Sequence, residues 1–264
     1  KKVYAVEASP DIARVASRLA RANGLVGVVE VVPKHLEDIT YEEIPSGSVD
    51  VIVSELFSHF LVGELGLQAV TLARQRFLRP DGLVLPSLAR LKLSPFSDAA
   101  LGADLRVRHE FWRTKDFYGF DLSSAFPLAE EQALRENIVG IVDPATLLVS
   151  PDEAPSKELD LAGPSDPETW RRIDFEVAFP KRQRDGVVDG LCGWWDAIFA
   201  MPDGGPAPIL STAPTADPTV WAQCCFLLDQ PLPARAADRL TAKCNLKINE
   251  ARESYTLKIE CRNH

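Results

Sequence analysis

The chain has 264 residues, of which 46% are hydrophobic and 25% charged, a composition typical of one large globular domain or two modest ones. Its formal net charge of −9 argues against binding to nucleic-acid phosphates and favours a cationic partner, although ordinary cytosolic enzymes are often as acidic. No apolar run approaches the roughly 20 residues of a membrane-spanning helix, and the first residues do not resemble a signal peptide. The five cysteines show neither a CxxC pair nor metal-ligand spacing, which favours free thiols in a reducing compartment.

The first third of the chain alternates short apolar strands with helices, which predicts an α/β layer built on a parallel sheet. The expected elements are, in chain order, a strand at residues 3–7, a helix that begins at Ser9-Pro10 and ends at Asn23-Gly24, strands at 28–32 and 49–54, and a helix at 65–78 closed by Pro80-Asp81-Gly82. Ser9 is a favourable N-cap and Pro10 a favourable first helical residue. Because the strands are uniformly apolar, we expect both faces of the sheet to be covered.

After Pro86 the pattern changes to alternating strands separated by turn residues, which predicts a β-barrel or sandwich. The expected strands are at residues 87–96, 173–180, 187–200, 221–229, 240–248 and 254–261. A helical and aromatic segment at 98–128 interrupts them. Residues 150–168 are acidic and proline-rich without an apolar period, and we expect a mobile surface loop there. The chain is therefore expected to divide into residues 1–86 and 87–264.

Two carboxylates, Glu55 and Glu64, lie nine positions apart in an otherwise apolar and aromatic stretch after the third strand. A carboxylate held away from water is costly unless a cation or a hydrogen-bond donor meets it. A general acid/base pair, a metal site and a clamp for a cation all remain open, but His59 is the only metal-ligand candidate nearby. A guanidinium clamp is chemically natural, because arginine presents a planar fork of donors that pairs bidentately with carboxylates.

Two further acids stand where a nucleotide would be bound in an α/β fold. Glu7 ends the first strand just before a helix, where an acid accepts hydrogen bonds from ribose hydroxyls; an acid near a helix N-terminus is an equally good explanation. Glu37 follows the second strand, where an acid can accept from an adenine amine with Leu36 against the ring, although a solvated loop acid is simpler. The glycine-rich turn that should precede the strand ending at Glu7 is not in the chain, so we expect it, with a strand and a helix, before Lys1.

Five segments in a fixed order carry a resemblance to a known family: VYAVEAS, VDVIVSELFSHFLVGE, LRPDGLVLPSLARLKLSPF, FWRTKDFYGFDLS and LSTAPTADPTVWAQ. They resemble the protein arginine methyltransferases, and most closely the coactivator-associated type. The resemblance implies a Rossmann-like S-adenosylmethionine-binding domain at residues 1–86, with its N-terminal part missing. A β-barrel substrate domain at 87–264 would follow, with Pro86 at the junction and a helical dimerisation arm at 98–128.

The resemblance also implies site residues. Glu55 and Glu64 would be the catalytic acids of the family's double-glutamate loop. The implied cofactor-binding residues are Glu7, Ala8, Leu36, Glu37 and Ser54. The implied substrate-pocket residues are Phe57, His59 and Trp221. The cofactor would be S-adenosyl-L-methionine, which leaves S-adenosyl-L-homocysteine as product, and no metal is implied.

The implied reaction moves a methyl group from a sulfonium to a guanidinium nitrogen of a protein arginine, in substrates such as histones or RNA-binding proteins. Two acids that grip the guanidinium would polarise its charge and hold the free nitrogen on the line of attack. The apolar surroundings would exclude water and strengthen the ion pairs. The expected partners are protein substrates and a second copy, or a related chain, bound through the arm. We expect no direct nucleic-acid binding, no membrane, and a location in the cytoplasm, the nucleus or both.

The sequence departs from the family around the expected pocket. The family's Met-Gly-Tyr between the acids is Phe57-Ser58-His59 here, and its Thr-His-Trp is Thr219-Val220-Trp221. The bulkier Phe57 leaves the choice between asymmetric and symmetric dimethylation open, with the asymmetric product expected. Val220 cannot supply the histidine that lines the arginine pocket, and His59 is a candidate substitute. These losses leave an alternative, a weak or inactive subunit that acts as dimer partner or scaffold. A small-molecule methyltransferase would leave the barrel and arm motifs unexplained.

Overall fold

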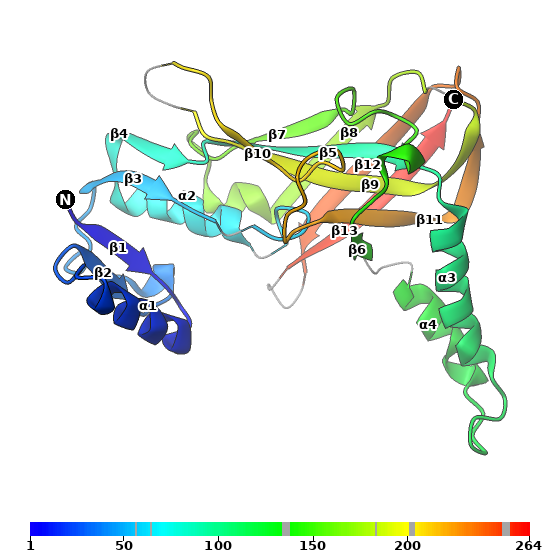
Figure 1. Cartoon of the computed structure of the whole chain (residues 1–264), viewed down its shortest axis with the longest axis horizontal. Coiled ribbons are helices and arrows are strands. Elements are labelled where there is room, and N and C mark those ends of the chain that lie inside the picture. The colour runs from blue at the N-terminus through cyan, green and yellow to red at the C-terminus, as the bar shows by residue number, and fades with distance from the viewer. Residues whose placement is uncertain (56, 64, 134–137, 183, 201–203, 250–253) are drawn as a thin grey trace.

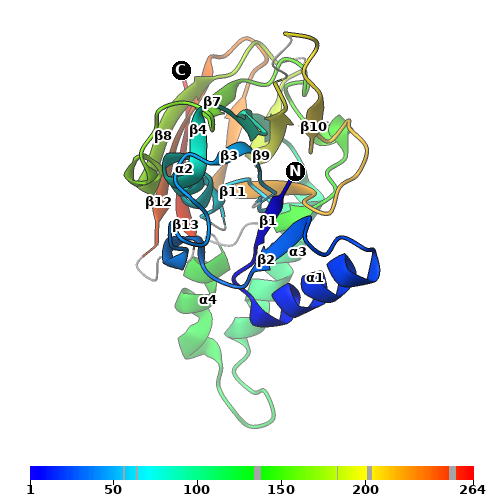
Figure 2. The same ribbon diagram turned by 90° about the vertical axis from the view of Figure 1, so that its left-hand side faces the viewer.

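A computed structural model shows a small N-terminal α/β unit, a large pair of β-sheets and a helical projection (Figures 1 and 2). The structure describes residues 1–264 except 56, 64, 134–137, 183, 201–203 and 250–253. Within the residues described, none of the helices combines the length and the apolar character needed to cross a membrane.

The N-terminal part contains two separate pairs of parallel strands. Its elements are β1 (Val3–Val6), α1 (Pro10–Ala22), β2 (Val29–Val32), the short 3₁₀ helix η1 (Leu36–Asp38), β3 (Val49–Val53), α2 (Gly66–Phe77) and β4 (Leu78–Leu85). β1 pairs with β2, and β3 pairs with β4. In the described part of the chain no strand joins one pair to the other. The predicted alternation of strands and helices is therefore confirmed, but the sheet is not continuous.

The apolar strands of this part are more exposed than the sequence predicts. Val3 of β1 is 52% exposed and Val53 of β3 is 74% exposed. The apolar stripe of α1 shows the same property, since Ile12, Val15 and Leu19 are each more than half exposed. The expectation that both faces are covered is wrong for this structure: a small buried cluster with Val32 of β2 and Phe77 of α2 covers part of these strands, and the exposed side chains lie outside it.

Two local predictions also need correction. Ser9 precedes α1 but its side chain makes no capping hydrogen bond; instead its backbone N–H donates to Oε1 of Glu7 at 2.7 Å. Pro80-Asp81-Gly82 does not close α2 as a turn but lies within β4, where the pairing with β3 is irregular. A proline is tolerated at such an irregularity because no ladder N–H is required there.

The second part of the chain, which we call the barrel, consists of two antiparallel sheets. Its strands are β5 (Leu88–Phe96), β6 (Ile138–Gly140), β7 (Ser156–Asp160), β8 (Arg172–Ala178), β9 (Gly186–Ile198), β10 (Ile209–Ser211), β11 (Gln223–Ala234), β12 (Leu240–Ile248) and β13 (Tyr255–Asn263). The first sheet has the order β6-β11-β9-β5-β7, with β10 paired to β9, and the second has the order β13-β12-β8. All six strands predicted for this half are confirmed.

The main hydrophobic core lies between these sheets and extends to the segment after β3. Trp195 of β9 and Leu240 of β12 are fully buried in it, and so is Leu91 of β5. The neighbouring Trp194 points to the opposite face of β9, where it is also fully buried, in a second cluster with Phe96. β9 is therefore covered on both faces, and each buried side chain of leucine size contributes roughly 1.5–3 kcal/mol.

Residues 150–168 were expected to form a mobile loop, and this prediction is wrong. Within them β7 pairs with β5, and Leu159 and Leu161 are each only 2% exposed. Asp166 then forms a capping box at the start of the 3₁₀ helix η5 (Pro167–Arg171). The acidic and proline-rich composition hid two well-spaced leucines that anchor the segment to the core.

A helical projection lies between β5 and β6, where the sequence predicts an arm at 98–128, and its last helix runs past residue 128. It contains α3 (Ala99–Glu110), η2 (Phe111–Arg113), η3 (Ser123–Ala125) and α4 (Phe126–Ala133), and it extends away from both sheets (Figure 1). Asp98 caps α3 by accepting the N–H of Leu101 at 3.0 Å. Between the helices, Tyr118 is 89% exposed and Phe120 is 72% exposed. The arm therefore presents large aromatic side chains to solvent.

Candidate functional site

We call residues 55–65, which join β3 to α2, the acid loop. The loop begins where the backbone N–H of Ser54 donates to the carbonyl oxygen of Leu85 at 3.0 Å, so it leaves the carboxyl end of β3. Glu55 is exposed. Glu64, the second predicted acid, lies outside the described residues, as does Leu56. Ligands of open α/β sheets bind beyond the carboxyl ends of the strands, so Glu55 stands at an edge suited to a site.

The apolar side chains of the acid loop anchor it to the core. Phe57, Phe60, Leu61 and Val62 are each at most 7% exposed. The expectation that these residues keep water away from the carboxylates is not met at Glu55, which is exposed while its apolar neighbours turn toward the barrel. The apolar character of the loop therefore reflects its attachment to the core.

The backbone of the acid loop is tightly constrained. Leu61 and Leu65 have positive φ angles of 59° and 58°, a region that costs a non-glycine residue about 1 kcal/mol or more. Ser58 and Leu61 exchange two backbone hydrogen bonds, and the hydroxyl oxygen of Ser58 accepts the N–H of Gly63 at 2.6 Å. Such strain persists where packing and hydrogen bonds fix the backbone, and it is frequent at functional sites.

Two tryptophans of the barrel hold the acid loop through its backbone. The indole N–H of Trp221 donates to the carbonyl oxygen of Phe57 at 2.9 Å, and that of Trp195 donates to Ser58 at 3.1 Å. Nδ1 of His59 lies 2.7 Å from the carbonyl oxygen of Trp221. The ring of Trp195 packs against both Phe57 and Trp221, with centroid distances of 5.2 and 5.0 Å. The structure thus brings together the three residues predicted for the substrate pocket.

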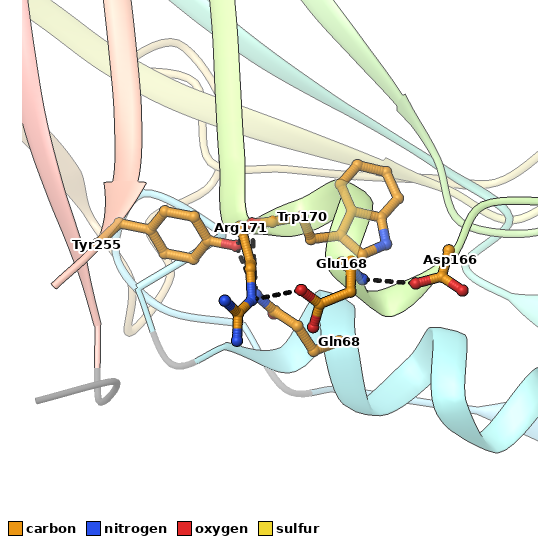
Figure 3. Close-up of polar contacts among 6 residues, drawn as sticks. All are labelled: Gln68, Asp166, Glu168, Trp170, Arg171 and Tyr255. Atoms are coloured by element: carbon orange, nitrogen blue, oxygen red, sulfur yellow. Dashed lines mark hydrogen bonds and ion pairs between the residues drawn. The ribbon is translucent and has the colours of Figure 1, made fainter. Parts of the chain in front are cut away.

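The helix after the acid loop is attached to the barrel by a second set of contacts (Figure 3). Nε2 of Gln68 donates to the hydroxyl of Tyr255 at 2.8 Å, and that hydroxyl donates to the carbonyl oxygen of Trp170. The indole N–H of Trp170 donates to Oγ1 of Thr71 at 2.8 Å. The phenol of Tyr255 is a donor at neutral pH, and burial raises its pKa to about 12. Both ends of the loop are therefore held in place.

On the cofactor side, Glu7 follows β1 and is half-buried. Its backbone N–H donates to Val32 of β2, and its carboxylate accepts the N–H of Ser9 at the start of α1. These contacts orient the Glu7 carboxylate beyond the carboxyl end of the β1–β2 pair. Ala8 is exposed beside it, whereas Ser54 follows β3 of the other strand pair, which in the described part of the chain is not paired with β1 or β2.

Leu36 and Glu37 lie on η1, which an arginine of α2 holds in place. The guanidinium of Arg76 donates to the carbonyl oxygens of Leu36 at 2.8 Å and Glu37 at 3.1 Å, and also to that of Ile39. It lies 4.9 Å from the ring centroid of Phe77. Arg76 was not predicted as a functional residue. Its one signal in the sequence is its place in the last turn of a helix, and most cations at such positions are solvated.

The comparisons with known proteins agree with this arrangement. A family model described as "Arginine methyltransferase oligomerization subdomain" matches residues 89–263. A protein named "Probable histone-arginine methyltransferase 1.3" from Arabidopsis thaliana is 32% identical over 98% of this chain. The "Histone-arginine methyltransferase CARMER" of Culex quinquefasciatus is 33% identical over 98% of the chain. The chain spans only 46% and 41% of the lengths of these two relatives.

Solved structures show the same fold. The "Trypanosoma brucei PRMT1 enzyme-prozyme heterotetrameric complex with AdoHcy" matches with a TM-score of 0.78 and 22% identity, over 99% of this chain and 81% of that one. Arabidopsis thaliana protein arginine methyltransferase 10 matches with a TM-score of 0.75 and 26% identity, over 100% of this chain and 82% of that one. The Rossmann-like unit followed by a β-barrel is thus the architecture of these neighbours, and the chain belongs to the arginine methyltransferase family.

Proposed function

We propose that the chain carries the catalytic acids of an S-adenosylmethionine-dependent protein arginine N-methyltransferase. Family membership and the names of the relatives support the activity. The observation that carries the proposal is the attachment of the acid loop to both parts of the fold. The loop leaves the carboxyl end of β3, the edge at which ligands of α/β sheets bind, and Trp195 and Trp221 fasten it to the barrel.

The residues on the cofactor side fit the proposed nucleoside. S-adenosylmethionine would supply a methyl group on a sulfonium, and Glu7, Ala8, Leu36, Glu37 and Ser54 would hold it. A carboxylate has about four acceptor positions, and the bond from Ser9 uses one of those of Glu7, so ribose hydroxyls can donate to the others. Arg76 fixes the backbone of η1, which would place Leu36 and Glu37 against the adenine.

Glu55 and Glu64 are proposed to bind the substrate guanidinium through paired hydrogen bonds. A guanidinium remains protonated at neutral pH, and delocalisation makes its nitrogens weak nucleophiles. Two carboxylates on its edges draw positive charge toward themselves, leave the third nitrogen richer in electrons and keep it aligned with the methyl group. Because Glu55 is exposed here, we expect the bound arginine side chain itself to displace water from this carboxylate.

The proposed substrates are arginine-containing proteins such as histones or RNA-binding proteins, with asymmetric dimethylarginine as the product. The proposed assembly is a homodimer, or a heteromer with a related chain, formed through the arm at residues 98–128. The match to an oligomerization subdomain supports this assembly, and so do the exposed aromatic side chains of Tyr118 and Phe120. The absence of direct nucleic-acid binding and the nuclear or cytoplasmic location stay predictions.

A second candidate function is a dimer partner or scaffold with little activity of its own. Phe57 is bulkier than the methionine that the family resemblance leads one to expect, and Val220, 85% exposed, replaces a histidine. The solved complex from Trypanosoma brucei is described as containing a prozyme beside the enzyme. A supporting subunit of this fold is therefore a concrete alternative.

Two measurements separate the candidates. The purified protein is incubated with methyl-labelled S-adenosylmethionine and a histone mixture, and modified arginines are identified by mass spectrometry. Binding of S-adenosylhomocysteine is measured in parallel by calorimetry. An enzyme binds the nucleoside and labels arginine on its own, whereas a scaffold labels arginine only after a related chain is added. If neither binding nor labelling occurs in any combination, the proposed function is wrong.

A further inference from the structure

His59 is the one ionisable side chain in the described part of the acid loop that contacts the barrel. Its Nδ1 lies 2.7 Å from the carbonyl oxygen of Trp221, a residue 162 positions later in the chain. His59 is exposed, so ordinary burial does not explain this contact. A surface histidine usually gains little from one fixed orientation, because ordering a side chain costs conformational entropy.

The contact of His59 belongs to a continuous set. Three consecutive loop residues each form one hydrogen bond to a barrel tryptophan: the carbonyl oxygens of Phe57 and Ser58 accept from indole N–H groups, and the ring of His59 meets a backbone carbonyl. Trp221 takes part twice, as donor through its side chain and as acceptor through its backbone. The acid loop and the turn at 219–222 are therefore bound to each other from both directions.

The chemistry of the contact fixes the form of the imidazole. A backbone carbonyl oxygen only accepts hydrogen bonds, so Nδ1 of His59 must carry the hydrogen. In the neutral ring, Nε2 is then an acceptor on the opposite side. The hydrogen on Nδ1 is the only one that the bond to Trp221 requires.

The turn that receives His59 is itself constrained. Ala222 has a positive φ of 50°, and its N–H donates to the carbonyl oxygen of Thr219 at 3.2 Å. Val220 projects into solvent and is 85% exposed. The imidazole at this turn is therefore supplied by the acid loop, through His59, and the residue at 220 has no part in the contact.

We propose that His59 is a positioning residue that fastens the acid loop to the 219–222 turn of the barrel and thereby sets the place of Glu55. The expected effect on methyl transfer rests on the proposed function, whereas the attachment of the loop to the barrel does not. Because Glu55 lies four residues before His59 on one constrained loop, loss of the contact is expected to let the carboxylate shift relative to the substrate nitrogen. Misplacement of a catalytic group by about 1 Å can lower the rate as much as a hundredfold.

Two variants at position 59 isolate the hydrogen bond. Histidine, asparagine and leucine all branch at Cγ, and the atom that follows Cγ is Nδ1, an amide nitrogen or a methyl group, respectively. His59→Asn retains a donor at that point, and His59→Leu retains the bulk without the donor. His35→Leu, on the exposed turn after β2, controls for the general loss of a histidine.

The first readout does not require activity. The indole N–H resonances of Trp195 and Trp221 are assigned with Trp→Phe variants, and their exchange with water is measured by NMR. Loss of one hydrogen bond corresponds to about a tenfold effect, so His59→Leu is expected to speed exchange at Trp221 about tenfold. His59→Asn is expected to restore protection to within about threefold, and His35→Leu to leave it unchanged.

The second readout is methyl transfer at a temperature where all variants are folded. His59→Leu is expected to lower kcat about tenfold with the affinity for S-adenosylhomocysteine unchanged, and His59→Asn to recover most of the loss. If His59→Leu leaves indole exchange and kcat as in the parent protein, or if only its thermal midpoint falls, the positioning role is wrong. If the parent protein transfers no methyl group, the proposed function fails, and the exchange experiment still decides whether His59 fastens the loop.

Discussion

The strand β9 and the helix α1 are both rich in apolar residues, but the structure treats them in opposite ways. Leu191 of β9 is completely buried, as are the two tryptophans that follow on opposite faces of the strand. On α1, Val15 and Leu19 are 53% and 59% exposed. An apolar period therefore predicts which element forms, whereas burial depends on the segments that pack against it. The acid loop belongs to the same part of the chain as α1, but its apolar side chains are anchored in the core that contains β9.

The largest expected difference in stability is between two leucine-to-alanine substitutions, one in β9 and one in α1. Leu191→Ala is expected to lower the free energy of unfolding by about 2–5 kcal/mol, because it opens a cavity in a closely packed core. Leu19→Ala removes the same atoms from an exposed surface and is expected to cost no more than about 0.5 kcal/mol. Urea unfolding followed by circular dichroism measures both. Equal losses would show that α1 is packed as tightly as the barrel, contrary to this structure.

A smaller effect is expected where α2 joins the barrel. Thr71→Val keeps the shape of the side chain but removes the acceptor of the Trp170 indole N–H, which is expected to cost about 1–3 kcal/mol. Thr256→Val on the exposed face of β13 is the matched control and is expected to stay within about 0.5 kcal/mol of the parent. A cost for Thr71→Val no larger than that of the control would mean that this contact does not hold α2 to the barrel.

Arg76 tests the N-terminal part of the chain, where apolar side chains are more exposed. Arg76→Leu removes the donor shared by two carbonyl groups of η1 and that of Ile39 after it, and we expect about a tenfold weaker affinity for S-adenosylhomocysteine. Arg79→Leu breaks only an exposed ion pair with Asp50 and is expected to change this affinity less than twofold. Calorimetric titration of the two variants distinguishes them. Similar affinities would remove the proposed role of Arg76 in shaping the adenine turn.

The smallest effect is a difference in alkaline stability at Tyr255. Its pKa is raised by burial to about 12, above its ordinary value of 10.0, so the folded state favours the neutral phenol. That contribution is fully present below pH 10 and is lost as the pH rises toward 12. At neutral pH Tyr255→Phe is expected to be about 1 kcal/mol less stable, because the bond to Trp170 is lost.

The free energy of unfolding of the parent and of Tyr255→Phe is measured between pH 9 and pH 12. The gap between the parent and Tyr255→Phe is expected to narrow with rising pH, because only the parent must bury or release a phenolate. The buried cysteines titrate in both proteins, so their effect cancels in the comparison. A gap that stays constant up to pH 12 would mean that the phenol is as accessible in the folded state as in the unfolded chain.

The sequence predicted those features that local pattern and order along the chain determine. The barrel strands followed from alternation and turn residues, and the helical segment at 98–128 followed from its interruption of that pattern, whereas its reading as an arm came from the family resemblance. The exposure of Glu55 did not, because the same apolar residues are compatible with shielding a carboxylate or with anchoring its loop. The contacts of Phe57 and His59 with Trp221 were also beyond prediction in detail, since they join segments far apart in the chain. Leu159 escaped notice because its neighbours are charged and prolines flank the segment.

If the two acids of the loop grip an arginine for methyl transfer, removal of either carboxylate must slow the reaction. Transfer of labelled methyl groups to histone arginines is measured for the parent, Glu55→Gln, Glu64→Gln and Asp152→Asn, the last an exposed acid in the turn before β7. Either glutamate substitution is expected to lower kcat about a hundredfold to a thousandfold while S-adenosylhomocysteine still binds, since each removes a negative charge that would stabilise the transition state, and Asp152→Asn is expected to behave as the parent. Parent-like transfer by Glu55→Gln or Glu64→Gln would show that the two acids do not grip the arginine.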